Sequence, residues 1–320
     1  MSEPYKPPYS LSDHAINRVS QISELIGSLL VTNVMKSNPK LRRNNRVRTI
    51  HASLAIENNS LTLDQVTAII NGKRVLGPPS EILEVQNAYQ AYERLMELNP
   101  YMVEDLLLAH SMLMRDLVKE AGKFRSGGVG IFAGNHLIHM APPADFVPQQ
   151  IYELIQWTKN SEVHPLVKSC VFHYEFEFIH PFSDGNGRMG RMWQTLLLSQ
   201  WKPFLAWLPV ESIIRDNQEQ YYQVLAQCDK SADSGAFISF MLDAIYKALL
   251  EIGDVDTNIE RILNAIGNDT LPAREIMQRM GLSNRASFRR LYLLPAVDKD
   301  LIEMTVPDKP NSSQQKYRRK

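Results

Sequence analysis

The chain has 320 residues, of which 44% are hydrophobic and 22% are charged, and its formal net charge is zero. This composition is typical of a globular protein with roughly two domains, and the lack of a basic excess argues against a sequence-independent role on nucleic acid or on a membrane surface. Two cysteines, Cys170 and Cys228, lie far apart and predict a reduced protein. Because neither a signal-peptide pattern nor an apolar run of membrane-spanning length occurs, we expect a cytoplasmic protein.

The N-terminal part, residues 1–100, is predicted to be a helical region. Three prolines within the first ten residues favour an extended start. Apolar residues then recur at helical spacing over residues 12–30, 44–57, 62–72 and 80–98. We therefore expect helices alone in this part of the chain.

The central part, residues 101–250, is predicted to be a helical domain with one small hairpin. Alternating apolar residues on both sides of a Gly-Asn pair predict two short strands, 129–133 and 136–140. Helical periodicity covers residues 103–118, 147–160, 164–179, 188–201, 213–229 and 235–253. The fold class is therefore mainly α.

The last part, residues 255–320, has a different pattern, which predicts three short helices and a strand-like end. Residues 271–292 have the spacing of a helix-turn-helix, and we expect a winged helix-like domain. One interpretation is a DNA-binding module with Arg285, Arg289 and Arg290 on its second helix. The other is a module of the same shape that packs on the core or binds protein.

The segment HPFSDGNGRMGR, residues 180–191, combines groups that suit phosphate chemistry. Pro181 cannot continue the preceding helix, so His180 stands at a helix end, where an imidazole can accept a proton near neutral pH. Gly185 and Gly187 lack side chains, so backbone N–H groups can converge there on an anion. The segment thus predicts an anion-binding turn beside a general base.

A helix that begins near Asn186 turns its positive end toward this turn. Arg188 and Arg191 project from one side of its start, where guanidinium groups can bind further phosphates. Asp184 suits Mg²⁺ bound jointly with a polyphosphate. Because the segment lacks the P-loop lysine and an adjacent Ser or Cys nucleophile, we expect an external hydroxyl or water to be deprotonated by His180.

Residues 180–191 match the motif HxFx[DE]GNGRxxR of the Fic family at every specified position. The chain resembles this family over residues 50–245. The resemblance implies a Fic-type helical bundle in which the hairpin is a flap. It also implies a protein adenylyltransferase, which transfers AMP from ATP to a Tyr, Thr or Ser hydroxyl of a target protein and of itself.

The resemblance implies a role for each residue of the motif. His180 deprotonates the acceptor hydroxyl, Phe182 anchors the loop in the core, and Asp184 holds Mg²⁺ between the α and β phosphates. The remaining positions bind ATP: the α phosphate is cradled by Gly185, Asn186 and Gly187, the β phosphate meets Arg188, and the γ phosphate meets Arg191.

A second segment, SLAIEN from Ser53 to Asn58, is similar to the inhibitory pattern [ST]xxxE[GN] of the family. The resemblance implies that Glu57 pairs with Arg191 and keeps this guanidinium from the γ phosphate. A misplacement of about 1 Å can lower a rate on the order of 10²-fold, so we expect an autoinhibited resting state. In some relatives the equivalent glutamate helps to position water for AMP removal, which leaves the direction of the reaction open.

The predicted hairpin could accept an extended target segment as an added strand and present its hydroxyl to His180; the alternative is a structural hairpin that covers the core. The resemblance places one part of the hairpin near ATP: Ile131, Phe132, Ala133 and Gly134. Relatives line the adenine and ribose pocket with a segment that here offers Tyr221, Tyr222 and Asp229. Relatives often have Asn where this chain has Asp229.

Three alternatives to AMP transfer stay open. Some relatives move UMP, phosphocholine or phosphate, and the Glu57 carboxylate could serve deadenylylation instead. From a different class, the protein could be a DNA-binding regulator whose core senses nucleotide. The sequence leaves the target protein, the modified residue and a homodimer undecided.

Overall fold

The structure is a computed structural model, and it describes residues 5–31, 39–128, 130–133, 136–298, 301–309, 312 and 314–320. At residues 31, 130–133, 136–140, 254–257 and 298 it describes the backbone alone. The chain divides into two compact units, one of residues 1–23 and 45–247 (unit 1) and one of residues 24–44 and 248–320 (unit 2). Helices α1, α3 and α12 contribute residues to both units.

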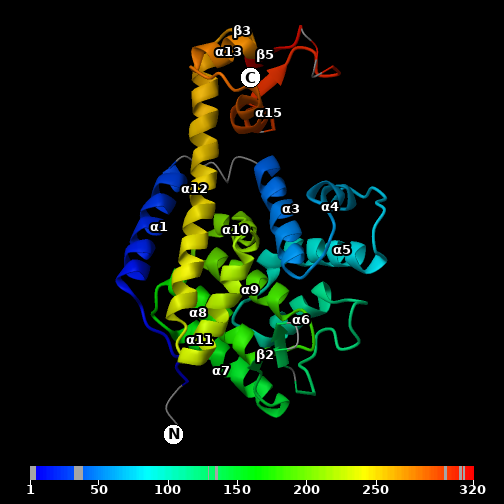
Figure 1. The fold of residues 1–320 in the computed structure, drawn as a ribbon, viewed down its shortest axis with the longest axis vertical. Coiled ribbons are helices and arrows are strands. Elements are labelled where there is room, and N and C mark those ends of the chain that lie inside the picture. Colours follow the sequence, from blue (N-terminus) through cyan, green and yellow to red (C-terminus); the bar gives the residue numbers. More distant parts are fainter. Residues whose placement is uncertain are drawn as a thin grey trace. The chain divides into compact units, whose positions relative to one another are not determined.

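Unit 1 is a bundle of helices with one β-hairpin (Figure 1). Its helices, with those shared between the units, are α1 (Asp13–Val31), α3 (Pro39–Ile56), α4 (Leu63–Ile70), α5 (Pro79–Glu93), α6 (Val103–Leu113), α7 (Val147–Asn160), α8 (Pro165–Ile179), α9 (Asn186–Trp201), α10 (Val210–Asp216), α11 (Gln218–Ser231) and α12 (Gly235–Ile266). Short 3₁₀ turns are η1 (Leu95–Glu97), η2 (Ala144–Phe146) and η3 (Pro203–Trp207). The mainly helical class predicted from the sequence is confirmed.

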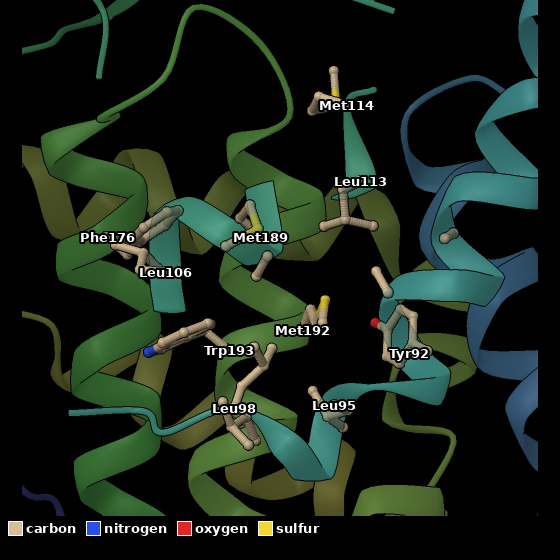
Figure 2. Packing of buried hydrophobic residues seen from close by; sticks show 14 of the residues in the cluster. Tyr92, Leu95, Leu98, Leu106, Leu113, Met114, Phe176, Met189, Met192 and Trp193 are labelled. Atoms are coloured by element: carbon tan, nitrogen blue, oxygen red, sulfur yellow. The ribbon is translucent and has the colours of Figure 1, made fainter. Parts of the chain in front are cut away.

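Helices α8 and α9 pack along each other in the core of unit 1. Nearly every residue of α8 is buried, which explains why its apolar residues do not form a single stripe. Figure 2 shows Met189, Met192 and Trp193 of α9 among the side chains of α6 and of the η1 region, which belong to the same buried cluster. The start of α9, where the motif lies, is therefore held on a rigid support.

The predicted hairpin is present in unit 1. Strand β1 (Gly130–Ala133) pairs antiparallel with β2 (His136–Met140), and a bulge lies between Ile131 and Phe132. Strand β2 lies against α11. The hairpin thus packs on a helix of the bundle.

Unit 2 has a core of its own, to which Ile262, Ile276 and Phe288 contribute. After α12 its elements are β3 (Thr270–Pro272), α13 (Ala273–Arg279), α14 (Arg285–Phe288), the π-helical turn η4 (Arg289–Leu293), α15 (Leu294–Asp298), β4 (Ile302–Met304) and β5 (Lys316–Arg319). Strand β5 lies between β3 and β4 and is antiparallel to both. Two helices joined by a turn and followed by two paired strands agree with the predicted winged helix-like fold.

Two helices extend beyond their predicted bounds. The helix expected to end near residue 253 continues to Ile266, because Ile259, Ile262 and Ile266 keep the apolar spacing and enter the core of unit 2. The first of the three short helices predicted after residue 255 is therefore the end of α12. Helix α3 begins at Pro39 rather than at residue 44, since proline is well accepted in the first turn.

Two other predicted helices are interrupted. The helix expected over 103–118 ends at Leu113, and Asp116 then has a φ of 60°, which an α-helix cannot continue. The helix expected over 213–229 is two helices, because Asn217 leaves the helical conformation at φ −124°. Every helix in the described part of the chain is too short or too polar to cross a lipid bilayer.

Candidate active site

The junction of α8 and α9 holds the candidate base. Helix α8 ends at Ile179, and His180 adopts the left-handed conformation (φ 50°, ψ 62°), with its N–H donating to the carbonyl of Phe176 at 3.0 Å. The next residue, Pro181, cannot continue a helix. Nδ1 of His180 lies 3.3 Å from the carbonyl oxygen of Glu177. When Nδ1 donates to this carbonyl, Nε2 carries the lone pair that a general base needs.

The loop after His180 is anchored by His110 of α6. The buried ring of Phe182 stacks on the His110 ring, with centroids 3.6 Å apart and planes inclined by 3°. Nδ1 of His110 accepts the N–H of Gly122 (2.9 Å), so Nε2 carries the hydrogen and donates to the carbonyl of Asp184 (3.0 Å). Burial lowers the pKa of His110 to about 4. His110 is therefore a neutral support for the loop.

Arg125 ties the same loop to the base of the hairpin. Its buried guanidinium donates to the carbonyl oxygens of His180 (2.7 Å), Ile179 (3.2 Å), Gly127 (2.8 Å) and Pro142 (2.6 Å). Gly127 and Pro142 flank the hairpin in the chain, one before β1 and one after β2. The backbone that carries His180 is thus joined to both ends of the hairpin.

Asn186 and Gly185 close the turn at the start of α9. The buried Asn186 side chain accepts the N–H of Phe182 (2.9 Å) and donates to its carbonyl (2.8 Å). Gly185 has a φ of 84°, a left-handed conformation that glycine adopts without strain. The amide of Asn186 is therefore engaged in shaping the loop, while the backbone N–H groups of the first turn of α9 have the arrangement that suits an anion.

Arg188 is buried between two carboxylates. Its guanidinium contacts Asp184 at 2.9 Å and Glu84 of α5 at 3.2 Å. Within the described residues, its buried Nε has no hydrogen-bond partner. A buried unpaired donor on a cation suits an anionic ligand such as a phosphate.

Arg191 is almost fully enclosed and is held by the end of α3. Nε donates to the hydroxyl of Ser53 (3.1 Å), while Nη2 donates to the Ser53 carbonyl (3.0 Å) and to the Glu57 carboxylate (2.7 Å). Burial lowers the pKa of Arg191, but the Glu57 carboxylate, together with Tyr221 and Glu177, raises it overall. The contact between Glu57 and Arg191 that the resemblance implies is present.

The Glu57 carboxylate also covers the start of α9. A Cβ built on Gly187 would overlap the Glu57 oxygen Oε1. The Glu57 side chain is 30% exposed, against 1% for Arg191, so it reaches the guanidinium from the solvent side. Asn58 follows with a φ of 68° and ends the helix, a role that suits Asn or Gly. The pattern [ST]xxxE[GN] therefore describes a helix end that places one carboxylate.

The residues predicted to bind adenine and ribose lie in different surroundings. Tyr221 is fully buried, and its hydroxyl contacts Nε2 of His173 (3.1 Å). Tyr222 is 44% exposed and donates to the carbonyl of Ile56, next to Glu57. Asp229 accepts the hydroxyl of Tyr174 (2.9 Å). Their contact with a nucleotide stays a prediction.

The hairpin residues expected near ATP are described in part. Residues 131–133 lie in strand β1, of which the structure describes the backbone alone, and Gly134 lies outside the described residues.

Three residues around the site follow no sequence motif: Glu84, His110 and Arg125. Each lies in an ordinary helical or glycine-rich stretch of the sequence. Only the tertiary contacts bring them to the motif, so no local pattern could have identified them.

The Asp184 carboxylate suits a cation that is bound together with a polyphosphate. Asp184 is the motif carboxylate, and its side chain is 56% exposed. Among the described residues, no group of three or more His, Cys, Asp or Glu side chains could hold a metal ion by itself. Mg²⁺ commonly takes one or two carboxylates together with substrate phosphates and water. Asp184 therefore fits Mg²⁺ only as part of a nucleotide complex.

A left-handed histidine at a helix end, a glycine turn and two buried arginines on a helical bundle define a Fic-type core. Residues 99–198 match the Fic/DOC family, and residues 257–319 match the C-terminal domain of "Filamentation induced by cAMP protein Fic-like". A crystal structure of a Fic family protein from Desulfovibrio desulfuricans G20 is 53% identical, with a TM-score of 0.77, and the match covers 99% of this chain and 98% of that chain. This chain belongs to the Fic family.

More distant relatives share part of the chain. The protein adenylyltransferase Fic of Nematostella vectensis is 29% identical over 208 residues, which are 60% of this chain and 45% of that protein. The match thus spans less than half the length of this curated relative. A Fic domain containing signaling protein from Bacteroides thetaiotaomicron is 17% identical with a TM-score of 0.59, over 83% of this chain and 100% of that chain, which indicates a shared fold.

Proposed function

We propose that this chain is a protein adenylyltransferase, which transfers AMP from ATP to a hydroxyl of a target protein. The observation that carries the proposal is a pair of buried arginines, Arg188 and Arg191, at the start of α9 and close in sequence to His180. Each arginine binds a carboxylate. Phosphate oxygens can bind a guanidinium group in the same way as carboxylate oxygens do. The name of the Nematostella relative supports the same activity.

In the proposed reaction, Nε2 of His180 takes the proton of the incoming hydroxyl. The hydroxyl oxygen attacks the α phosphorus, and the bond to the pyrophosphate group breaks. Backbone N–H groups at the start of α9 stabilise the charge that develops on the α phosphate. Asp184 would hold Mg²⁺ together with the nucleotide, and the ion would supply neutralisation of the charge on the phosphates. General-base action by His180 contributes a factor of roughly 10²–10⁴.

The resting state is proposed to be autoinhibited. Glu57 occupies the guanidinium of Arg191 that the γ phosphate requires, and it covers the face of Gly187. A triphosphate can bind productively only after this carboxylate leaves. The partly exposed position of Glu57 supports such a withdrawal, because the side chain has solvent beside it.

The substrate of the proposed reaction is an extended segment of a protein. An added strand on the β1–β2 hairpin would bring a Tyr, Thr or Ser hydroxyl toward His180. The hydrogen bonds from Arg125 to both flanks of the hairpin and to the His180 carbonyl support this role, because they fix the distance between the two. A hydroxyl of the chain itself is the simplest available acceptor for a first test.

The test is intact-mass analysis of the full-length Glu57→Gly variant after incubation with Mg²⁺ and each of the four nucleoside triphosphates. We expect a gain of one AMP with ATP and no gain when His180→Ala is added. A gain with a different nucleotide would reassign the donor. The absence of any gain, on this chain and on added protein extracts, would exclude the transferase. Release of AMP from a modified protein that requires Glu57 would instead indicate the reverse reaction.

A second candidate function, DNA binding by unit 2, is favoured by the basic side chains on its surface. Arg285 and Arg290 are exposed on the second helix of the helix-turn-helix, and Lys316 and Arg319 are exposed on β5. The test is fluorescence anisotropy with duplex DNA at several salt concentrations. A steep salt dependence that weakens in Arg285→Ala would support DNA binding. No binding at low salt would favour a protein-contact module.

A further inference from the structure

Two carboxylates lie on the face of α9 that carries Arg191. Glu57 covers Gly187, and a Cβ built on Gly190 would lie only 2.7 Å from Oε1 of Glu177. Gly187 and Gly190 are three residues apart, so they lie on the same side of the helix. Glu57 directly follows α3, whereas Glu177 lies on α8, the helix that leads to the candidate base.

The Glu177 carboxyl has no role in the packing or in the mechanism described above. The residue is 8% exposed, and its Oε1 is buried without a hydrogen-bond partner in the described structure. The neighbouring His173 lies 3.8 Å away, but its ring nitrogens are taken by the Gln194 oxygen (2.7 Å) and by the Tyr221 hydroxyl (3.1 Å). A buried polar oxygen left unpaired is rare and destabilising, so this carboxyl requires an explanation.

The charged and titratable groups that interact with Glu177 come from four parts of the chain: Glu57 just after α3, His173 on α8, Arg191 on α9, and Tyr221 and Tyr222 on α11. Burial raises the pKa of Glu177 to about 8, with Arg191 opposing the rise and Glu57 adding to it. Burial lowers the pKa of His173 to about 3 and raises the pKa of both tyrosines, so these three groups are neutral. Glu177 is therefore largely neutral while Glu57 holds Arg191.

We propose that Glu177 is the alternative ion-pair partner of Arg191, a positioning residue that takes over the guanidinium when Glu57 withdraws. This inference rests on the proposed function, because it requires that the γ phosphate of ATP binds Arg191 after Glu57 has withdrawn. Without Glu57, Arg191 would be a buried cation with no carboxylate, which is strongly unfavourable. Glu177 then releases its proton to water and pairs with the guanidinium, and an incoming triphosphate has to displace it.

This exchange has a defined proton balance. Loss of Glu57 removes a negative charge that raises the pKa of Glu177 and leaves Arg191, which lowers it, so the carboxyl ionises more readily. A phosphate that binds Arg191 brings a negative charge back, and Glu177 takes up one proton from water. The nucleotide complex therefore binds more protons than the free protein, and nucleotide affinity falls as the pH rises.

The test uses calorimetry on the full-length Glu57→Gly variant with a non-hydrolysable ATP analogue and Mg²⁺, from about pH 6.5 to about pH 9, a range that brackets a carboxyl raised by burial. We expect the affinity to fall with pH and about one proton to be taken up on binding. Adding Glu177→Gln removes the competing carboxylate. The affinity should then rise by about tenfold at alkaline pH and lose its pH dependence.

Glu175 provides the matched control. It lies two residues from Glu177 on α8, and burial raises its pKa to about 7, but its carboxylate accepts the Tyr5 hydroxyl at 2.6 Å. Glu175→Gln in the Glu57→Gly background should therefore keep the pH dependence. Glu177→Asp retains a carboxyl and should restore part of the pH dependence of nucleotide affinity. This result would show that the change in the glutamine variant does not come from a folding defect.

The outcomes separate the two proposals. Equal affinity and equal proton uptake with and without Glu177→Gln would overturn the role of Glu177 while leaving the proposed function intact. A loss of pH dependence in the Glu175→Gln control as well would also overturn it. Failure of the Glu57→Gly protein to bind nucleotide at any pH would overturn the proposed function, and this inference with it.

Discussion

Two regions meet the start of α9, and they are held in different ways. The loop from His180 to Gly185 is fixed through its backbone, which binds His110, Arg125 and Asn186. These hydrogen bonds lie within the protein, and a substrate offers no replacement for them. We refer to this loop as the fixed side of the site.

The end of α3 and the first half of α5 form the other side. There Glu57 holds Arg191, and Glu84 shares Arg188 with Asp184. A phosphate can replace a carboxylate on a guanidinium with little change in geometry. The difference between the two sides teaches that the candidate base is held by contacts within the protein, whereas the two arginines of the proposed phosphate site are held by carboxylates that a phosphate can replace.

The variant that tests the difference between the two sides with the largest expected effect is Glu57→Gln. The amide has nearly the same shape but no charge, so Arg191 becomes available to the γ phosphate. We expect AMP transfer to rise on the order of 10²-fold, the size of a misplacement effect, measured as the initial rate of labelled AMP incorporation. Glu81→Gln is the control. The Glu81 carboxylate accepts hydrogen bonds from the N–H and the hydroxyl of Ser60, and it lies away from both arginines. An unchanged rate in Glu57→Gln would show that the Glu57 carboxylate does not compete with the nucleotide for Arg191.

The contribution of His110 to the fixed side can be tested by measuring protein stability at lower pH. Burial lowers the pKa of His110 from 6.5 to about 4, so the unfolded chain binds a proton at higher pH than the folded chain. Stability is therefore lost as the pH falls from about 6.5 to about 4, and this group contributes a loss of about 2 kcal/mol between about pH 7 and about pH 5.

Urea unfolding at the two pH values measures this loss. His110→Phe keeps an aromatic ring against Phe182 but removes the titrating group, so its stability should depend less on pH. An equal pH dependence in both proteins would contradict the role of His110 as a buried neutral support.

The sequence allowed the fixed loop and its helix to be predicted, because a histidine before Pro181 and glycines in the turn each have a local physical meaning. The resemblance to the family also implied the Glu57 contact, because residues 53–58 carry the whole inhibitory pattern in one short segment. The supports on other elements could not be predicted. His110 and Glu84 reach the motif from α6 and α5 through tertiary packing, and a single helix pattern carries no information on such distances.

The boundaries of the last domain show the same limit. A break after residue 253 was expected from a change in pattern, yet α12 continues to Ile266. Its apolar spacing persists while the surface that it packs against changes from one unit to the other. Packing partners of this kind cannot be read from periodicity alone.

A smaller effect is expected for Ser53→Ala. The hydroxyl of Ser53 accepts the hydrogen bond from Nε of Arg191 (3.1 Å), and its loss should weaken the closed state by about 1 kcal/mol. The rate of AMP transfer should rise about fivefold. In a Glu57→Gln background the same change should add little. Ser60→Ala is the matched control, because the Ser60 hydroxyl donates a hydrogen bond to the Glu81 carboxylate.

The smallest effect is expected for Glu84→Gln. Arg188 keeps Asp184 at 2.9 Å, so removing one of two carboxylates leaves the guanidinium paired. We expect a rise in transfer rate of about twofold, within the range of a partly exposed ion pair. A rise as large as that of Glu57→Gln would show that α5 and α3 contribute equally to closure.

The amide of Asn59 links these two helices. It lies two residues after Glu57 and donates to the Glu84 carboxylate at 2.8 Å and to the Glu81 carbonyl at 3.2 Å. A movement that withdraws the end of α3 therefore also pulls on the carboxylate above Arg188. The Glu57 and Glu84 carboxylates should therefore leave the two arginines in one concerted event, so that occupancy by nucleotide follows a single transition rather than two separate ones.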